Sequence, residues 1–203
     1  MKKSVIQRLR VPLTNIFAVL LFVYFATSNR PWEVTYPLFT SIFFFTGLVL
    51  AAIGSFGRLW CSLYIAGWKT KVVITEGPYS ISRNPLYFFS FIGATGVGLA
   101  TETIFMPLLL IILFAFYYPH IIRKEEEKLL ARHGQSFQNY LDSVPKFFPR
   151  LSNLTEPQEY TVNPIIFRTH IFSALWFIWM VGILEILEEL HDLGMIPTLF
   201  TLY

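Results

Sequence analysis

Residues 77–87, GPYSISRNPLY, form one of two polar blocks that decide the fold of this chain, and residues 123–127, RKEEE, form the other. Between them the sequence is apolar over residues 86–100 and 104–119, with residues 101–103 as the connecting turn. Two apolar helices joined by so short a turn form a hairpin that returns to the membrane face from which it started. We therefore expect a cationic, amide-bearing block and a carboxylate block to meet on one face of a membrane.

The composition is that of a membrane protein. Hydrophobic residues make up 54% of the 203 residues and charged residues only 14%, whereas an average soluble domain has about 25% charged residues. The mean hydropathy is +0.53. This excludes an ordinary soluble domain, and we expect a single membrane domain over residues 1–203 whose active site is built from helix ends and loops.

Apolar segments predict an all-α, polytopic integral membrane protein with about five transmembrane helices plus a cytoplasmic amphipathic helix. The segments cover residues 12–27, 36–56, 86–100, 104–119 and 165–187. The third and fourth are short compared with the roughly 20 residues of a perpendicular crossing. No small-residue cleavage pattern follows the first segment, so we expect it to be retained as a span and not removed as a secretory signal.

Basic residues fall almost entirely on one side of this topology. If the N-terminus is cytoplasmic, the outer face receives Arg30 alone. The cytoplasmic face receives Lys2, Lys3, Arg8, Arg10, Arg58, Lys69, Lys71, Arg83, Arg123, Lys124, Lys128, Arg132, Lys146, Arg150 and Arg168. The formal net charge of +3 is therefore a signal of topology and not of nucleic-acid binding. We expect an active site that faces the cytoplasm, in the plasma membrane of a prokaryote.

Residues 123–144 predict the amphipathic helix, because their apolar positions recur at steps of three and four. Gly134 is expected to interrupt it, and Pro145 and Pro149 to end it. Residues 57–67 carry Arg58 and aromatic residues in an apolar setting, and we expect them to continue the second span into the headgroup layer.

Arg83, Asn84 and Pro85 stand at the mouth of the third span. Proline suits the first turn of a helix, and the backbone donors of that turn are a site for an anionic group. An alternative is that Arg83 only anchors the span to lipid phosphates. Residues 125–127 are three glutamates about 100° apart around a helix, so one or two of them face inward, unless the run is simply solvated. The single cysteine, Cys61, excludes an internal disulfide, and zinc-site spacing is absent, so no metal site is expected.

In their order, the two blocks and the sequence after them resemble the isoprenylcysteine carboxyl methyltransferase family and the related phospholipid methyltransferases. The resemblance covers residues 58–149, which we take as the methyltransferase core, with residues 150–203 as a connector and a C-terminal transmembrane helix. Its specificity lies in the ordered combination of Gly77, Pro78, Tyr79, Arg83, Asn84, Pro85, Leu86, Tyr87, Glu125, Glu126, Leu129, Leu130, Gly134, Phe137, Tyr140, Val144, Pro145 and Pro149.

This resemblance implies that S-adenosylmethionine occupies a cytosol-facing pocket over the short hairpin, while a lipid substrate enters sideways from the bilayer. By position, the implied cofactor contacts are Lys71, Val72, Val73, Ile74, Tyr79, Arg83, Asn84, Pro85, Leu86, Tyr87 and Glu125. The implied catalytic residues are Arg123, the nearest candidate for the family's substrate-orienting arginine, and Glu126, a candidate base.

One departure from the family is Asn84, which stands where the family has histidine. Asparagine keeps a hydrogen-bond donor but lacks an ionisable ring. A methyl group on a sulfonium is already activated, so alignment and exclusion of water matter more than proton transfer. A carboxylate acceptor arrives deprotonated, whereas an ammonium headgroup needs a base, for which Glu125 or Glu126 is the candidate.

The sequence leaves several functions open. The acceptor is an isoprenylcysteine-type carboxylate, another lipophilic substrate, or the amine of a phospholipid. A membrane reductase that uses NADPH is a second enzymatic reading, and a small membrane scaffold or transporter is a non-enzymatic one. The expected partners are membrane lipids and a lipophilic substrate, with no nucleic acid, and the oligomeric state is open.

Overall fold

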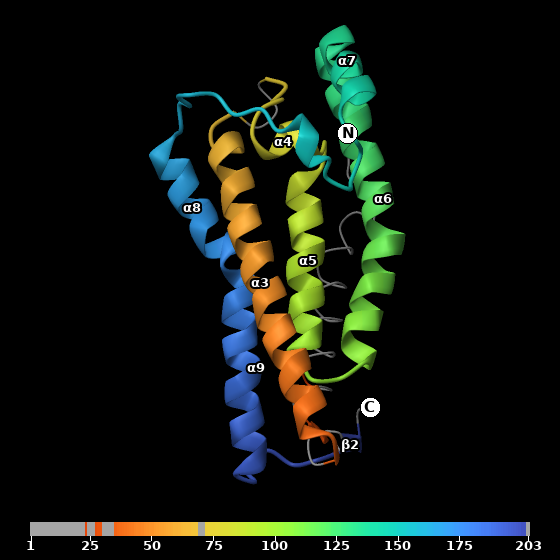
Figure 1. Ribbon diagram of the computed structural model, residues 1–203, viewed down its shortest axis with the longest axis vertical. Helices are drawn as coiled ribbons and strands as arrows, with labels where there is room; N and C mark the ends of the chain where they lie inside the picture. Colours follow the sequence, from red (N-terminus) through yellow and green to blue (C-terminus); the bar gives the residue numbers. More distant parts are fainter. Residues whose placement is uncertain (1–22, 24–26, 30–34, 69–71, 202–203) are drawn as a thin grey trace, which may run out of the picture.

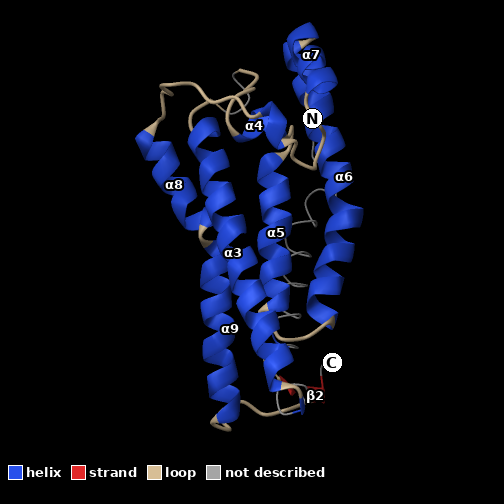
Figure 2. Cartoon of the chain, in the orientation of Figure 1, coloured by secondary structure: helices blue, strands red, loops and turns tan. Residues whose placement is uncertain are grey.

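The structure is a computed structural model that describes residues 23, 27–29, 35–68 and 72–201. Figure 1 shows long helices that run side by side, with short helices and loops at one end of the bundle, here called the loop end. The elements are β1 (Ser28–Asn29), α3 (Pro37–Ile65), α4 (Pro78–Ile81), α5 (Pro85–Leu99), α6 (Phe105–His133), α7 (Gln135–Ser143), η1 (Leu151–Asn153), α8 (Pro164–Ala174), α9 (Trp176–Asp192) and β2 (Phe200–Thr201). Figure 2 confirms the all-α expectation, apart from the short parallel pairing of β1 with β2.

Three helical segments of the described chain are long and apolar enough to cross a membrane: α3, α6, and α8 with α9 taken together as Pro164–Asp192. The fourth apolar helix, α5, has 15 residues, which corresponds to about 22 Å at 1.5 Å per residue. That is less than the roughly 30 Å of a bilayer's hydrocarbon core. The first predicted span, residues 12–27, lies almost wholly outside the described residues, so the expected number of about five spans is not confirmed.

The outward face of the bundle is apolar. Large side chains on three helices are exposed, among them Phe45, Phe56, Phe116 and Phe172. A continuous surface of this kind is unfavourable in water and favourable against lipid tails. The buried positions of α3 are mostly small residues instead, which lets neighbouring helices approach closely.

Helices α3 and α5 pack backbone against backbone. A Cβ atom on Gly54 would lie 2.4 Å from the Cα atom of Gly93, and one on Gly96 would lie 2.4 Å from the amide nitrogen of Ala51. Only glycine permits such an approach. The N-terminus of α5, which carries the first polar block, is thereby held at a fixed position beside α3.

The second polar block belongs to α6, which runs without a break from Phe105 to His133 and contains Pro119. The expectation of a separate helix that begins at Arg123 is therefore wrong, because a change from apolar to charged residues does not interrupt helical hydrogen bonding. The interruption at Gly134 is confirmed, since its φ of +55° ends α6 and α7 begins at the next residue. The second span is confirmed to continue past residue 56, as far as Ile65.

The chain reaches its last helices through a connector at the loop end. The indole nitrogen Nε1 of Trp68 donates to the carbonyl oxygen of Thr161 at 3.0 Å, and the hydroxyl of Tyr160 donates to the carbonyl oxygen of Tyr64 at 2.7 Å. These contacts place the connector across the end of α3. The predicted last span is divided at Leu175 into α8 and α9.

Candidate active site

The loop between α3 and α5 begins with a turn that requires glycine. Gly77 has a φ of +57°, and a Cβ atom there would lie 2.3 Å from the Cζ atom of Tyr64. The amide of Gly77 donates to the carbonyl oxygen of Thr155 at 2.8 Å, and the amide of Thr155 donates to Ser80 Oγ at 3.0 Å. The connector thus supports the short helix α4 just before the first motif residues.

Residues 81–84 pair with the segment that follows α7. The amide of Arg83 donates to the carbonyl oxygen of Pro145 at 2.9 Å, and the amide of Arg150 donates to the carbonyl oxygen of Ile81 at 2.9 Å. The hydroxyl of Ser82 donates to the carbonyl oxygen of Phe147 at 3.0 Å. The prolines after α7 end its helical hydrogen bonding, so residues 145–150 are free to form a wall beside the start of α5.

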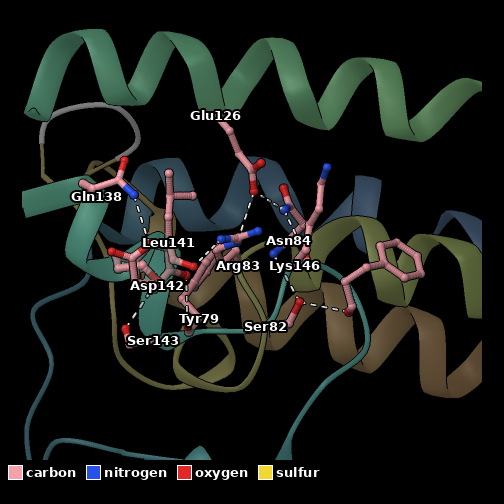
Figure 3. Close-up of polar contacts among 12 residues, drawn as sticks. Tyr79, Ser82, Arg83, Asn84, Glu126, Gln138, Leu141, Asp142, Ser143 and Lys146 are labelled. Atoms are coloured by element: carbon pink, nitrogen blue, oxygen red, sulfur yellow. Dashed lines mark hydrogen bonds and ion pairs between the residues drawn. The ribbon is translucent and has the colours of Figure 1, made fainter.

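Glu126 joins the two polar blocks (Figure 3). Its Oε1 atom lies 3.2 Å from the Nε atom of Arg83 and accepts a hydrogen bond from Asn84 Nδ2 at 3.3 Å. Arg83 also donates to the carbonyl oxygen of Leu141. The side chains of Arg83 and Glu126 are 14% and 16% exposed, so solvent screens this pair less than a surface pair. We call Arg83, Asn84 and Glu126 the clasp.

Asn84 acts as a double donor in the clasp. Besides its bond to Glu126, Nδ2 donates to the carbonyl oxygen of Lys146 at 2.9 Å, and the residue is buried. A neutral histidine has a single N–H and could serve only one of these acceptors. Asn84 therefore suits a positioning role, and its amide offers no base.

Next to the clasp lies a cavity of about 400 Å³, here called the clasp cavity. It is lined by residues of both polar blocks, of the segment before α4, and of α7. The lining residues are Ile65, Val72, Val73, Ile74, Tyr79, Arg83, Asn84, Pro85, Leu86, Tyr87, Glu125, Glu126, Lys128, Leu129, Arg132, Phe137 and Tyr140. Asn84 and Glu125, from opposite ends of the hairpin sequence, therefore line one space of nucleotide size.

The structure brings together nearly all the residues singled out from the sequence. Every predicted cofactor contact lines the clasp cavity except Lys71, which lies outside the described residues. Glu126 lines it too, whereas Arg123 does not. The Arg123 side chain is 68% exposed, and its Nε atom lies 3.7 Å from Glu127 Oε1. Arg123 points away because it lies on a different face of α6 from Glu125 and Leu129.

Six lining residues were given no site role from the sequence: Ile65, Lys128, Leu129, Arg132, Phe137 and Tyr140. The three of them that lie on α6 could have been found from their spacing in the sequence. Leu129 and Arg132 follow Glu125 by four and seven residues, so all three lie on one face of a helix. Lys128 and Arg132 add positive charge to a cavity whose other charged groups include Glu125 and the clasp.

Two tyrosines at the cavity are held in their protonated form. Burial raises the pKa of the Tyr79 phenol well above its usual value. Burial also raises the pKa of Tyr140, an effect that Arg83 opposes and Glu126 reinforces. The hydroxyl of Tyr140 donates to the carbonyl oxygen of Tyr79 at 2.8 Å, so it fixes α7 against the first polar block and does not act as a base.

A second cavity of about 320 Å³, here called the apolar cavity, lies between α5, α6 and the segment after α7. It is lined by Phe91, Ile111, Phe114, Ala115, Tyr118, Pro119, Ile122, Lys146, Phe147 and Phe148. The rings of Tyr118 and Tyr87 are in edge contact, 5.0 Å between centroids. Because Tyr87 lines the clasp cavity, this ring pair is the boundary between the two cavities.

Comparison with known proteins gives both a family and relatives. The profile of the family described as "Phospholipid methyltransferase" matches residues 33–135. The chain is 33% identical over 177 residues to the nickel-cobalt-cadmium resistance protein NccN of Alcaligenes xylosoxydans xylosoxydans, covering 87% of this chain and 82% of the relative. It is 34% identical over 195 residues to the cobalt-zinc-cadmium resistance protein CzcN of Cupriavidus metallidurans, covering 95% of this chain and 86% of the relative.

No solved structure gives a significant match to the chain. Since both relatives are named for metal resistance, clusters of metal-binding side chains are of interest. Within the described ranges, no three histidine, cysteine, aspartate or glutamate residues form a group that could hold a metal ion.

Proposed function

The chain belongs to the phospholipid methyltransferase family, which is related to the isoprenylcysteine carboxyl methyltransferases, and from this premise we propose that it uses S-adenosylmethionine to methylate a lipid-like acceptor. The observation that carries the proposal is the clasp cavity, where the two motif blocks form opposite walls. Its volume of about 400 Å³ falls in the range of roughly 300–1,000 Å³ that is usual for small-molecule sites.

The residues around the clasp cavity fit the chemistry of this cofactor. S-adenosylmethionine supplies a methyl group that is activated on a positively charged sulfur. Glu125 offers a carboxylate for its cationic part, Lys128 and Arg132 offer positive charge for its carboxylate, and Tyr87 offers an aromatic face. The chain's own contribution is to align the two reactants and to exclude water, which needs no catalytic triad.

We assign the acceptor to the apolar cavity, next to the Tyr87–Tyr118 boundary. Its walls are aromatic and aliphatic, which suits an isoprenoid or acyl chain that enters from the bilayer between α5 and α6. Glu126 is already engaged by Arg83 and Asn84. If the acceptor is a phospholipid amine, Glu125 is therefore the better candidate base.

We propose that the site faces the cytoplasm, in the plasma membrane of a prokaryote. Lys128, Arg132, Lys146 and Arg150 all belong to the loop end of the bundle, in agreement with the positive-inside rule. The two relatives are named for metal resistance, so we propose that the methylated product contributes to tolerance of divalent metals. Growth of a deletion strain in nickel, cobalt and cadmium salts tests that setting.

The central test is calorimetry of the purified full chain with S-adenosylhomocysteine. We expect saturable binding, weakened about tenfold by Glu125→Ala and by Tyr87→Ala because each removes a cavity wall. Glu127→Ala is the matched control, since its exposed side chain does not line the cavity. Absence of saturable binding to the wild-type chain overturns the function, and unchanged affinity in both variants overturns the site assignment.

A further inference from the structure

Tyr118 brings a hydroxyl group into a cavity that is otherwise aromatic and aliphatic. Among the described residues that line the apolar cavity, only Tyr118 and Lys146 have polar side chains. Lys146 is exposed, whereas Tyr118 is partly buried. The phenol hydroxyl of Tyr118 has no hydrogen-bond partner within the described part of the chain. A polar group that is withdrawn from bulk water without a partner calls for an explanation.

Packing accounts for the ring of Tyr118 but not for its hydroxyl. The ring is stacked on that of Phe114, with 4.1 Å between centroids and 8° between planes, and it meets the ring of Tyr87 edge-on at 5.0 Å. A phenylalanine could make both contacts, as Phe91 and Phe147 make theirs in the same cavity, and it would bury no unpaired donor. The hydroxyl therefore points to a ligand of the cavity.

The two cavities follow each other along the contact between α5 and α6, about one helical turn apart. On α5, Tyr87 lines the clasp cavity and Phe91 the apolar cavity. On α6, Ile122 lines the apolar cavity and Glu125 the clasp cavity. At 1.5 Å per residue these steps correspond to about 6 Å and 4.5 Å. Since reacting atoms must approach to about 3 Å, a ligand end held at the boundary is within reach of a group in the clasp cavity.

We propose that Tyr118 is an acceptor-binding residue, whose hydroxyl holds the polar end of the methyl acceptor at this boundary by a hydrogen bond while the apolar cavity takes its chain. The inference rests on the proposed methyltransferase function. A phenol both donates and accepts, so it can hold an oxygen or an N–H group. In the transfer, a lone pair of the acceptor atom forms the new bond to the methyl carbon as the C–S bond breaks. The electron pair of that bond stays on sulfur, and Tyr118 neither gains nor loses a proton.

The experiment measures transfer of a radiolabelled methyl group from S-adenosylmethionine to total lipid extract, with the full chain and the extract in mixed detergent micelles. Tyr118→Phe removes the hydroxyl and keeps the ring. Tyr117→Phe is the matched control, because Tyr117 is the next residue along α6, is 44% exposed and lines neither cavity. Lys146→Gln removes the charge of the other polar side chain of the apolar cavity. Affinity for S-adenosylhomocysteine and the thermal midpoint are measured on each variant.

We expect Tyr118→Phe to lower the initial slope of rate against extract concentration by about 3- to 10-fold, because one hydrogen bond to the acceptor is lost. Cofactor affinity and the thermal midpoint should stay at their wild-type values, since the hydroxyl has no partner within the described part of the chain. Tyr117→Phe should leave all three quantities unchanged. Lys146→Gln should lower the slope less than Tyr118→Phe does, because its side chain is exposed.

A Tyr118→Phe slope equal to that of the wild-type chain, or a larger loss in Lys146→Gln, overturns the role of Tyr118 and leaves the methyltransferase function standing. A Tyr118→Phe variant that unfolds, or that loses cofactor affinity and thermal midpoint together, shows that the hydroxyl serves the fold and overturns that role too. A wild-type chain that binds S-adenosylhomocysteine but labels no lipid also overturns it. Failure of the wild-type chain to bind S-adenosylhomocysteine overturns both proposals.

Discussion

The two faces of α5 differ in how they contact their neighbours. Towards α3 the contact is between backbones, because a side chain on Gly96 of α5 or on Gly54 of α3 would strike the backbone of the other helix. Towards α6 the contact is between aromatic rings, including Phe91 with Phe114 and Tyr87 with Tyr118, and the apolar cavity lies among them. One helix is thus both a fixed support and a wall of the binding region.

Helices α5 and α6 are held together at both ends of their contact. At the turn, the hydroxyls of Thr101 and Thr103 are bonded at 3.0 Å, and Gly98 packs on Pro107. At the loop end the clasp bonds Arg83 and Asn84 to Glu126. Between these points the two helices are separated by side chains and by the apolar cavity.

Disrupting the close glycine contact between α3 and α5 should have the largest effect on stability. Gly54→Ala places a Cβ atom 2.4 Å from the Cα atom of Gly93, so α3 and α5 must separate, at a cost of about 3 kcal/mol in the free energy of unfolding. Thermal unfolding in detergent should show a midpoint lowered by roughly 6–12 °C. Gly182→Ala on α9 is the control, because its Cβ atom meets nothing within 4 Å. Equal midpoints for the two variants would show that the close contact does not support the fold.

Opening the clasp should have the next largest effect. Glu126→Ala leaves the Arg83 guanidinium and an Asn84 donor without their shared acceptor, so the loop end loses about 2–3 kcal/mol of stability. We expect binding of S-adenosylhomocysteine to weaken at least tenfold in calorimetry. Glu127→Ala removes a neighbouring carboxylate whose pair with Arg123 is 66–68% exposed, so it should change little. A similar loss in both variants would contradict the special role of Glu126.

Replacing the amide nitrogen of Asn84 by an oxygen tests how the clasp is bonded. Asn84→Asp replaces a double donor with a carboxylate that faces Glu126 and the carbonyl oxygen of Lys146. At pH 8 the repulsion should weaken cofactor binding several-fold relative to wild type. Towards pH 5.5 the introduced carboxyl gains a proton and becomes a donor, so the ratio of mutant to wild-type affinity should recover. A ratio that is constant over this range would contradict the donor role of Asn84.

The smallest effect is expected at the hydrogen bond between α7 and the first polar block. Burial raises the pKa of Tyr140 above its unfolded value, so its stabilising contribution is complete below about pH 10 and declines as the pH rises above it. Tyr140→Phe removes the bond to the Tyr79 carbonyl and should cost about 1 kcal/mol at pH 8. Thermal midpoints between pH 8 and pH 11 should fall less steeply for the variant than for wild type; identical slopes would show that Tyr140 does not contribute.

Much of the candidate site could be predicted because motif order and hairpin topology are properties of the chain itself. A turn of three residues between two apolar helices brings residues 77–87 and 123–127 to the same end whatever the detailed packing. Arg123 shows the limit of that approach. The resemblance suggested it as the nearest candidate for a substrate-orienting arginine, but the rotation of α6 places its side chain in solvent beside Glu127.

The sequence by itself determined the membrane character of the chain, the break at Gly134 and the meeting of the two polar blocks, because hydropathy, segment length and glycine content act locally. Tertiary structure alone decided that Glu126 and not Glu127 bonds to Arg83, that Asn84 bridges two segments, and that Tyr118 of α6 meets Tyr87 of α5. These features depend on how each helix is rotated about its axis and on contacts between residues far apart in the chain. Such contacts arise only when the backbones of α3 and α5 close on each other.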